Sequence, residues 1–154
     1  MVPEEAKRLI GKVDPPYVRE VEGGAVRRYA DAVGNGNPLY QDEEYAKKAR
    51  YGGLIAPPGF FGWPVKTEPQ SESVLAAMAA VEKAGYHRIL DGGIVYDFFR
   101  PVRVGDRLIV YMKVRDIVER ESKGGTMIVM ELEANYLDEK GDLVARSCQT
   151  LIRR

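Results

Sequence analysis

The second half of the chain alternates apolar and polar residues, beginning near Ile89. Successive side chains of a strand point to opposite faces, so a period of two predicts β-strands that bury one face. We expect four strands, the last over residues 143–153. The apolar sets of the first three are Ile94, Tyr96 and Phe98; Leu108, Val110, Met112 and Val114; and Ile128, Met130, Leu132, Ala134 and Tyr136.

The first half spaces its apolar residues as helices do. Within residues 23–33, an i, i+3, i+4, i+7 pattern predicts a helix that Gly34 ends. Asp42 is a suitable N-cap for a second helix over 43–50. The remaining elements that we expect are a helix over 70–84, a short helix over 3–10 and a short strand over 17–21.

The connections between the later strands are short. Lys123-Gly124-Gly125 and Asp138–Asp142 are suited to hairpins, and short connections between consecutive strands predict an antiparallel meander. Helices followed by such a sheet, with one face exposed to solvent, predict an α+β fold.

Composition narrows the class of protein. A length of 154 residues suits one domain over residues 1–154. Lys plus Arg and Asp plus Glu both number 23, so net charge provides no reason to expect nucleic acid or a membrane as partner. Cys148 is the single cysteine, which is typical of a cytoplasmic protein. No apolar run is long enough for a transmembrane helix, and the first residues lack the apolar core of a signal peptide.

The most specific motif is GNGNPLYQDEEYAKKARYGGLIAPPG at residues 34–59. It resembles the signature of the R-specific enoyl-CoA hydratases and MaoC-like dehydratases, in which Gly-Asp-x-Asn-Pro-Leu/Ile-His precedes a Tyr/Phe-Ala helix and an Ile-Ala-His-Gly loop. A second stretch, FRPVRVGDRL at residues 99–108, is similar to a turn common in the same proteins. The resemblance spans about residues 14–152. It implies a hot-dog fold, an antiparallel sheet wrapped around a helix, with extra helices in the N-terminal half.

Enzymes of this family add water to an acyl-thioester double bond or remove it. An Asp and a His activate one water, and a backbone N–H stabilises charge on the thioester oxygen. Here Asn35 stands at the Asp position, Tyr40 at the His position and Pro58 at the position of the N–H donor. A neutral amide is no general base, a phenol titrates near 10, and proline has no N–H. We therefore expect no catalytic residues at this site.

The departures resemble the non-catalytic half of dehydratases built from two hot-dog units. By that resemblance, the chain is an acyl-thioester-binding, non-catalytic subunit of an enoyl-CoA hydratase or 3-hydroxyacyl-thioester dehydratase of fatty acid metabolism. Its partner is then a hot-dog subunit bearing Asp and His, and its ligand an acyl-CoA or acyl-carrier-protein thioester. The expected substrate-binding residues are Asn35, Asn37, Tyr40, Pro58, Gly59, Phe60 and Trp63.

Two alternatives stay open. In one, the chain is a self-sufficient homodimeric hydratase with Tyr40 as acid and Asp31, Asp42 or His87 as base. In the other, it is an acyl-thioester-binding module without a hydratase role. No cofactor is expected, because the sequence has no phosphate-binding glycine loop, and one His with one Cys makes no metal site.

Overall fold

The computed structural model describes residues 1–60 and 71–154. The helix predicted over 3–10 and the strand predicted over 17–21 are confirmed in shortened form, and the remaining helices lie close to the predicted ranges. The elements are α1 (Glu4–Lys7), β1 (Tyr17–Glu20), α2 (Gly23–Ala32), α3 (Pro38–Gln41), α4 (Glu43–Lys48), α5 (Glu72–Lys83), β2 (Ile89–Phe98), β3 (Arg107–Ser122), β4 (Gly125–Leu137) and β5 (Leu143–Arg153).

The strands form one antiparallel sheet in the order β1-β3-β4-β5-β2. Both predicted hairpins are present, so β3, β4 and β5 form a meander. Strand β2 does not extend this meander by pairing with β3; it pairs with β5, as in Phe98 with Ala145. The beginning of β3 lies between β1 and β4, with Val110 opposite both Tyr17 and Tyr136. Both edges of this part of β3 are therefore occupied, and β2 pairs with the edge of β5 that faces away from β4.

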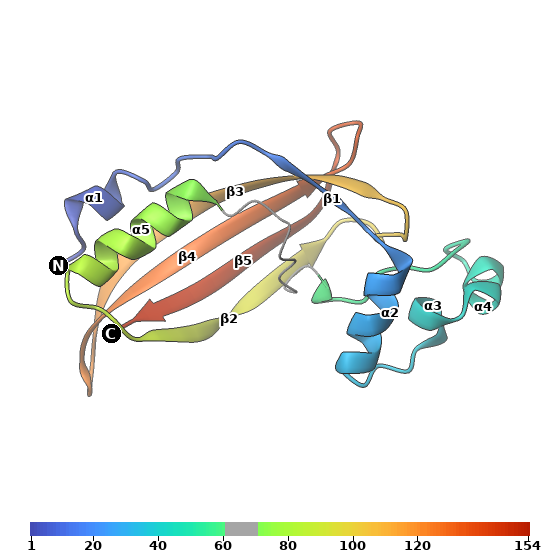
Figure 1. The fold of residues 1–154 in the computed structure, drawn as a ribbon, viewed down its shortest axis with the longest axis horizontal. Coiled ribbons are helices and arrows are strands. Elements are labelled where there is room, and N and C mark those ends of the chain that lie inside the picture. The colour runs from blue at the N-terminus through green and yellow to red at the C-terminus, as the bar shows by residue number, and fades with distance from the viewer. Residues whose placement is uncertain (61–70) are drawn as a thin grey trace.

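Helix α5 lies along one face of the sheet with α1 beside it, whereas α2, α3 and α4 lie beyond one end of the strands (Figure 1). Ser71 begins α5, because its hydroxyl accepts a hydrogen bond from the Val74 N–H at 3.2 Å. The helix turns Val74, Ala77 and Val81 toward the sheet. We call this face of the sheet the inner face and the opposite one the outer face.

The alternation read from the sequence is confirmed on the inner face. In β4 every second residue from Ile128 to Tyr136 is buried. These side chains contribute to two apolar clusters. One lies beneath α5 and α1 and includes Val81, Val114 and Met130. The other lies toward α2 and the motif and includes Tyr40. None of the helices within residues 1–60 and 71–154 is long and apolar enough to cross a membrane.

Candidate functional site

The motif begins where α2 ends. Gly34 adopts a φ of 68°, in the left-handed region that favours glycine, and turns the chain out of the helix. The Asn35 N–H then donates to the Ala30 carbonyl at 2.8 Å. The Asn35 side-chain oxygen accepts a hydrogen bond from the Asn37 N–H at 3.2 Å. The amide at the family's carboxylate position is therefore engaged in holding its own turn.

The next residues build two short helices in succession. The Asn37 side chain accepts from the Leu39 N–H at 3.0 Å and caps α3, and Pro38 occupies the first turn. Asp42 ends α3 and caps α4 by accepting from the Tyr45 N–H at 3.0 Å. The capping role expected of Asp42 is confirmed, and α3 is an addition that the spacing of apolar residues did not indicate.

Tyr40 points into the core. It is 8% exposed and belongs to an apolar cluster with Phe60 and Tyr136, against which Tyr29 and Tyr96 also pack. The residue at the family's imidazole position thus fills space between α3 and the sheet, as a packing aromatic does.

The second part of the motif is held by the turn at residues 99–108. The Ala56 N–H donates to the Val102 carbonyl at 2.8 Å, and the Val104 N–H donates to the Leu54 carbonyl at 2.9 Å. The Ile55 N–H donates to the Leu39 carbonyl at 3.2 Å. These bonds bring the two parts of the motif and the 99–108 turn into one assembly.

Gly59 and Phe60 pack against the side chain of Tyr29, which belongs to α2. The Tyr29 and Phe60 rings are perpendicular, with centroids 5.9 Å apart. Gly59 has a φ of 86°, and a Cβ there would lie 2.6 Å from the Tyr29 hydroxyl oxygen, so glycine is required at this close approach. Pro58 is exposed beside it. Trp63, also expected at the site, lies outside the described residues.

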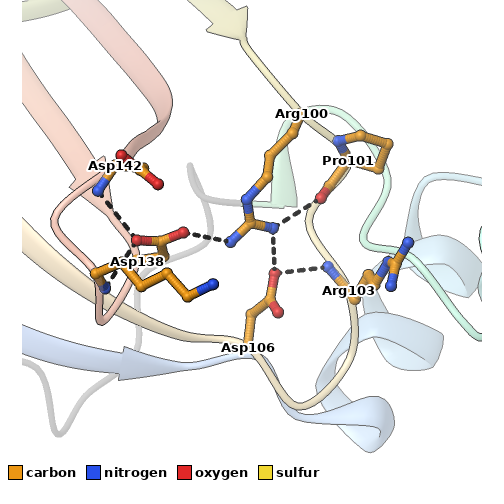
Figure 2. A network of polar contacts seen from close by, with 7 residues as sticks. Arg100, Pro101, Arg103, Asp106, Asp138 and Asp142 are labelled. Carbon is orange, nitrogen blue, oxygen red and sulfur yellow. Dashed lines mark hydrogen bonds and ion pairs between the residues drawn. The ribbon is translucent and has the colours of Figure 1, made fainter.

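The 99–108 turn is held by an arginine clamp (Figure 2). Arg100 donates to Asp106 at 2.9 Å and to the Pro101 carbonyl at 3.1 Å, and it forms an ion pair with Asp138 at 3.4 Å. The Arg103 N–H also donates to Asp106 at 3.0 Å. The Asp142 N–H, the Lys140 N–H and the Arg100 guanidinium hold the pKa of Asp138 below its usual range. Arg100 thus ties the turn to the β4–β5 hairpin.

Tyr96, which the sequence indicated only as a strand position, packs against the cluster that contains Tyr40. Its hydroxyl is buried and has no hydrogen-bond partner within the part of the chain that the structure describes. Burial raises the pKa of Tyr96 well above its usual range, and the nearby Tyr136 and Tyr29 phenols raise it further. The alternation of Ile94, Tyr96 and Phe98 was the available signal, because it places all three on the inner face.

The groups considered as replacement bases lie in different places. Asp31 is near the motif, because the Gln41 side-chain amide donates to Asp31 at 2.9 Å and to the Asn35 carbonyl at 3.3 Å. Asp42 is engaged as a helix cap. His87 is exposed in the connection between α5 and β2, which lies at the end of the sheet opposite α2–α4 (Figure 1). Among residues 1–60 and 71–154, no three His, Cys, Asp or Glu side chains are grouped as metal ligands would be.

Comparisons with known proteins agree with this architecture. Residues 8–147 match the family described as "FAS1-like, dehydratase domain region". A UPF0336 protein of Streptomyces avermitilis is 32% identical over 147 residues, which cover 95% of this chain and 93% of that protein. The "Probable enoyl-CoA hydratase alpha subunit" of Thermomonospora curvata is 26% identical over 137 residues, which cover 83% of this chain and 43% of that protein.

Two solved structures from Mycobacterium tuberculosis have the same fold. A chain of the ChsH1-ChsH2 complex superposes with a TM-score of 0.84 at 16% identity, covering 97% of this chain and 89% of that one. A chain of the C-terminally truncated HadBC complex, a (3R)-hydroxyacyl-ACP dehydratase, superposes with a TM-score of 0.70 at 22% identity, covering 94% and 96%. This chain belongs to the FAS1-like dehydratase-domain family, together with the UPF0336 proteins, and has the MaoC-like hot-dog fold.

Proposed function

We propose that residues 1–154 act as one hot-dog domain that binds an acyl thioester without transforming it. The domain is then the non-catalytic subunit of a hetero-oligomeric enoyl-CoA hydratase or 3-hydroxyacyl-thioester dehydratase. The observation that carries this proposal is that the motif residues at the family's catalytic positions have structural roles here. Asn35 holds its own turn, and Tyr40 fills the core.

The chemistry of hydration supports the same reading. A base and an acid within hydrogen-bond reach of one water each contribute about 10²–10⁴-fold to rate. Asn35 offers no carboxylate, and Tyr40 is directed away from solvent. Pro58 has no N–H, and one oxyanion donor is worth roughly 10²–10³-fold. The frame of the family is therefore intact while its reactive groups are missing.

Strand β2 supports pairing with another hot-dog subunit. It is an edge strand bonded only to β5 among the described strands, and residues on both of its faces are exposed. Val95 is 66% exposed on the outer side, and Ile94 and Phe98 are each 40% exposed on the inner side; Phe99, directly after the strand, is 56% exposed. A long apolar edge of this kind recruits another strand. The relatives named above as complexes and as an alpha subunit fit such a partnership.

The acyl group would lie among the aromatic residues beneath the motif. Phe60 and Tyr40 belong to the buried aromatic cluster there, and Gly59 keeps the chain beside Pro58 close to α2. Rigid aromatic side chains with a few polar groups are typical of small-molecule sites. We propose Asn35, Asn37, Tyr40, Pro58, Gly59, Phe60 and Trp63 as the residues on the ligand side of this subunit.

One observation favours a second candidate function, a self-sufficient hydratase. Gln41 joins the exposed carboxylate of Asp31 to the backbone of Asn35, so a base lies beside the motif on this chain. An Asp31→Asn variant distinguishes the two functions. It abolishes activity if Asp31 is a base, and it leaves the activity of a mixed complex unchanged if the base belongs to the partner.

The non-catalytic role is tested by co-expressing this chain with a hot-dog protein that bears the Gly-Asp-x-Asn-Pro-x-His motif. The gene for that protein should lie next to the gene for this chain. We expect the two chains to copurify and the complex to hydrate enoyl-CoA. A His→Ala change in the partner motif then abolishes activity, whereas Tyr40→Phe in this chain retains it. Thioester binding without any stimulation of such a partner would indicate the simple binding module instead.

A further inference from the structure

The outer face of the sheet carries three ranks of side chains, two that cross β3, β4, β5 and β2 and one that crosses β3 and β4. The strand register defines each rank, since residues directly opposite one another share a face. The basic rank contains Arg120, Met127, Arg154 and Arg88. The apolar rank contains Val118, Val129, Ile152 and Leu90. The acidic rank contains Asp116 and Glu131.

The arginines of the basic rank are available for a partner. Arg88 and Arg120 are exposed, and neither forms an ion pair with any described residue. Arg154 exchanges backbone hydrogen bonds with Arg88 at 2.7 and 2.9 Å, which holds two arginines side by side where β5 ends and β2 begins. Like charges on adjacent strands repel each other. This arrangement is therefore stabilised when an anionic group is brought between them.

The acidic rank is only partly neutralised within the chain. Arg115 forms an ion pair with Glu131 at 3.6 Å. Asp116 lies directly opposite Glu131, and its carboxylate accepts a hydrogen bond from the Ile117 N–H at 2.8 Å. Among the described residues it has no cationic partner. One carboxylate of this rank thus stays open to a cation from outside.

Between the two charged ranks lies exposed apolar surface. Leu90 is 47% exposed, and Val118, Val129 and Ile152 are partly exposed. Apolar side chains gathered across neighbouring strands and bordered by charges mark a contact surface. Along β3 alone the order is Asp116, Val118, Arg120, that is, acidic, apolar and basic at successive outer positions.

We propose that a second copy of this chain packs its outer face against this surface, about a two-fold axis that runs along the apolar rank. Rotation about that axis reverses the strand direction and places Arg120 of one copy opposite Asp116 of the other, twice per contact. Val118 then meets Val118 across the axis. An isologous contact requires a surface that is complementary to itself, and the acidic, apolar, basic order meets that requirement.

Charge order also favours a second copy over other partners. An anionic membrane or an acidic protein would match the basic rank but would be repelled by Asp116. Strands lie about 4.8 Å apart and same-face residues about 6.7 Å apart, so the patch measures roughly 400 Å² per copy. A standard interface buries about 800 Å² per partner. The contact is therefore weak, sensitive to salt, and formed in addition to pairing through β2.

Sedimentation velocity of the full chain, over a range of concentrations, tests the proposal. We expect an association step that weakens between about 0.1 M and about 1 M salt, as the Debye length falls from about 10 Å to about 3 Å. Arg120→Asp and Asp116→Arg each weaken that step by about tenfold or more. The double variant, Arg120→Asp with Asp116→Arg, restores it because both cross-copy pairs are re-formed with reversed sign.

Two controls make the outcome specific. Arg8→Asp makes the same change of charge at the exposed residue that caps the C-terminus of α1, and it leaves the step unchanged. Val129→Gln weakens it, which separates face-to-face packing from pairing between β3 edges, because an edge contact would not cover β4. Failure of the double variant to restore association overturns the proposal. So does an Arg120-dependent association with anionic vesicles in place of self-association.

Discussion

The Asp14 carboxylate accepts hydrogen bonds from both the backbone N–H and the hydroxyl of Ser73, at 3.0 and 2.9 Å. The Ser71 hydroxyl donates to the same carboxylate. Asp14 is only 7% exposed, so this group joins the segment before β1 to the first turn of α5. A negative charge at a helix N-terminus is favourable. The contact fixes the helix that lies on the inner face and thereby the two apolar clusters.

Replacing this carboxylate tests its contribution. Asp14→Asn loses charge-assisted hydrogen bonds, and we expect the free energy of unfolding at pH 7 to fall by about 1–3 kcal/mol. Asp97→Asn, which changes an exposed carboxyl on β2, is the matched control and leaves stability unchanged. Urea denaturation measures both. Equal stability of Asp14→Asn and the unaltered protein would contradict the role assigned to Asp14.

The same group makes stability depend on pH. Burial alone would raise the pKa of Asp14, but hydrogen bonds from Ser71 and Ser73 outweigh it and lower that pKa from its usual 3.8. A lowered pKa stabilises the fold above the unfolded pKa, and this contribution is lost as pH falls through the folded one. The stability difference between the protein and Asp14→Asn should therefore shrink below about pH 4. A difference that grows on acidification would contradict this.

Replacing Tyr96 should not lower the free energy of unfolding, in contrast to replacing Asp14. A buried hydroxyl without a partner costs about 1–3 kcal/mol, and phenylalanine removes the hydroxyl while keeping the ring. Tyr96→Phe should therefore leave the isolated chain equally stable or more stable in thermal unfolding. Tyr45→Phe, at an exposed position on α4, serves as the control with no change. A clear loss of stability in Tyr96→Phe would mean that its hydroxyl is hydrogen-bonded in the folded protein.

Gly59 should tolerate no side chain. Gly59→Ala brings a Cβ to 2.6 Å from the Tyr29 hydroxyl oxygen at a φ of 86°, and a strained conformation of this kind costs about 1–3 kcal/mol. Adding Tyr29→Phe removes the clash but not the backbone strain, so it restores part of the loss. Gly53→Ala has no atom in its way and should cost little. Additive effects of the Gly59 and Tyr29 changes in a double-mutant cycle would argue against the contact.

The effect of Pro58 on activity can be measured separately from the effects of Asn35 and Tyr40. In a chain carrying Asn35→Asp and Tyr40→His, we expect hydration of crotonyl-CoA to stay negligible. Adding Pro58→Gly restores a backbone N–H and should raise any activity by roughly 10²–10³-fold. Circular dichroism checks that Tyr40→His, at a buried position, still folds. Equal activity with and without the Pro58 change would show that this N–H has no role.

Much of the fold follows from local patterns, and much of the site does not. The inner face of β4 could be predicted because its alternation is local, as could the Asp42 cap. The pairing of β2 with β5 depends on which edges β1 and β4 already occupy, which is a long-range outcome. Asp14 and Ser73 lie 59 residues apart in sequence, so nothing local indicated their contact.

The motif shows the same division. The loss of the base at Asn35 and of the N–H donor at Pro58 could be predicted from residue type alone, because an amide is no base and proline has no N–H. The burial of Tyr40, and the unpartnered hydroxyl of Tyr96 in the same cluster, depend on how α3 and β2 pack and could not be read from spacing.

The turnover of the purified chain alone on enoyl-CoA tests the central claim most directly. Typical enzymes have a kcat of about 10 s⁻¹, and loss of the base alone costs about 10²–10⁴-fold. We predict turnover below about 10⁻² s⁻¹ for this chain, rising by at least a hundredfold when an Asp/His-bearing hot-dog partner is added. A kcat near 10 s⁻¹ for the chain without a partner, lost in Asp31→Asn, would contradict a non-catalytic role.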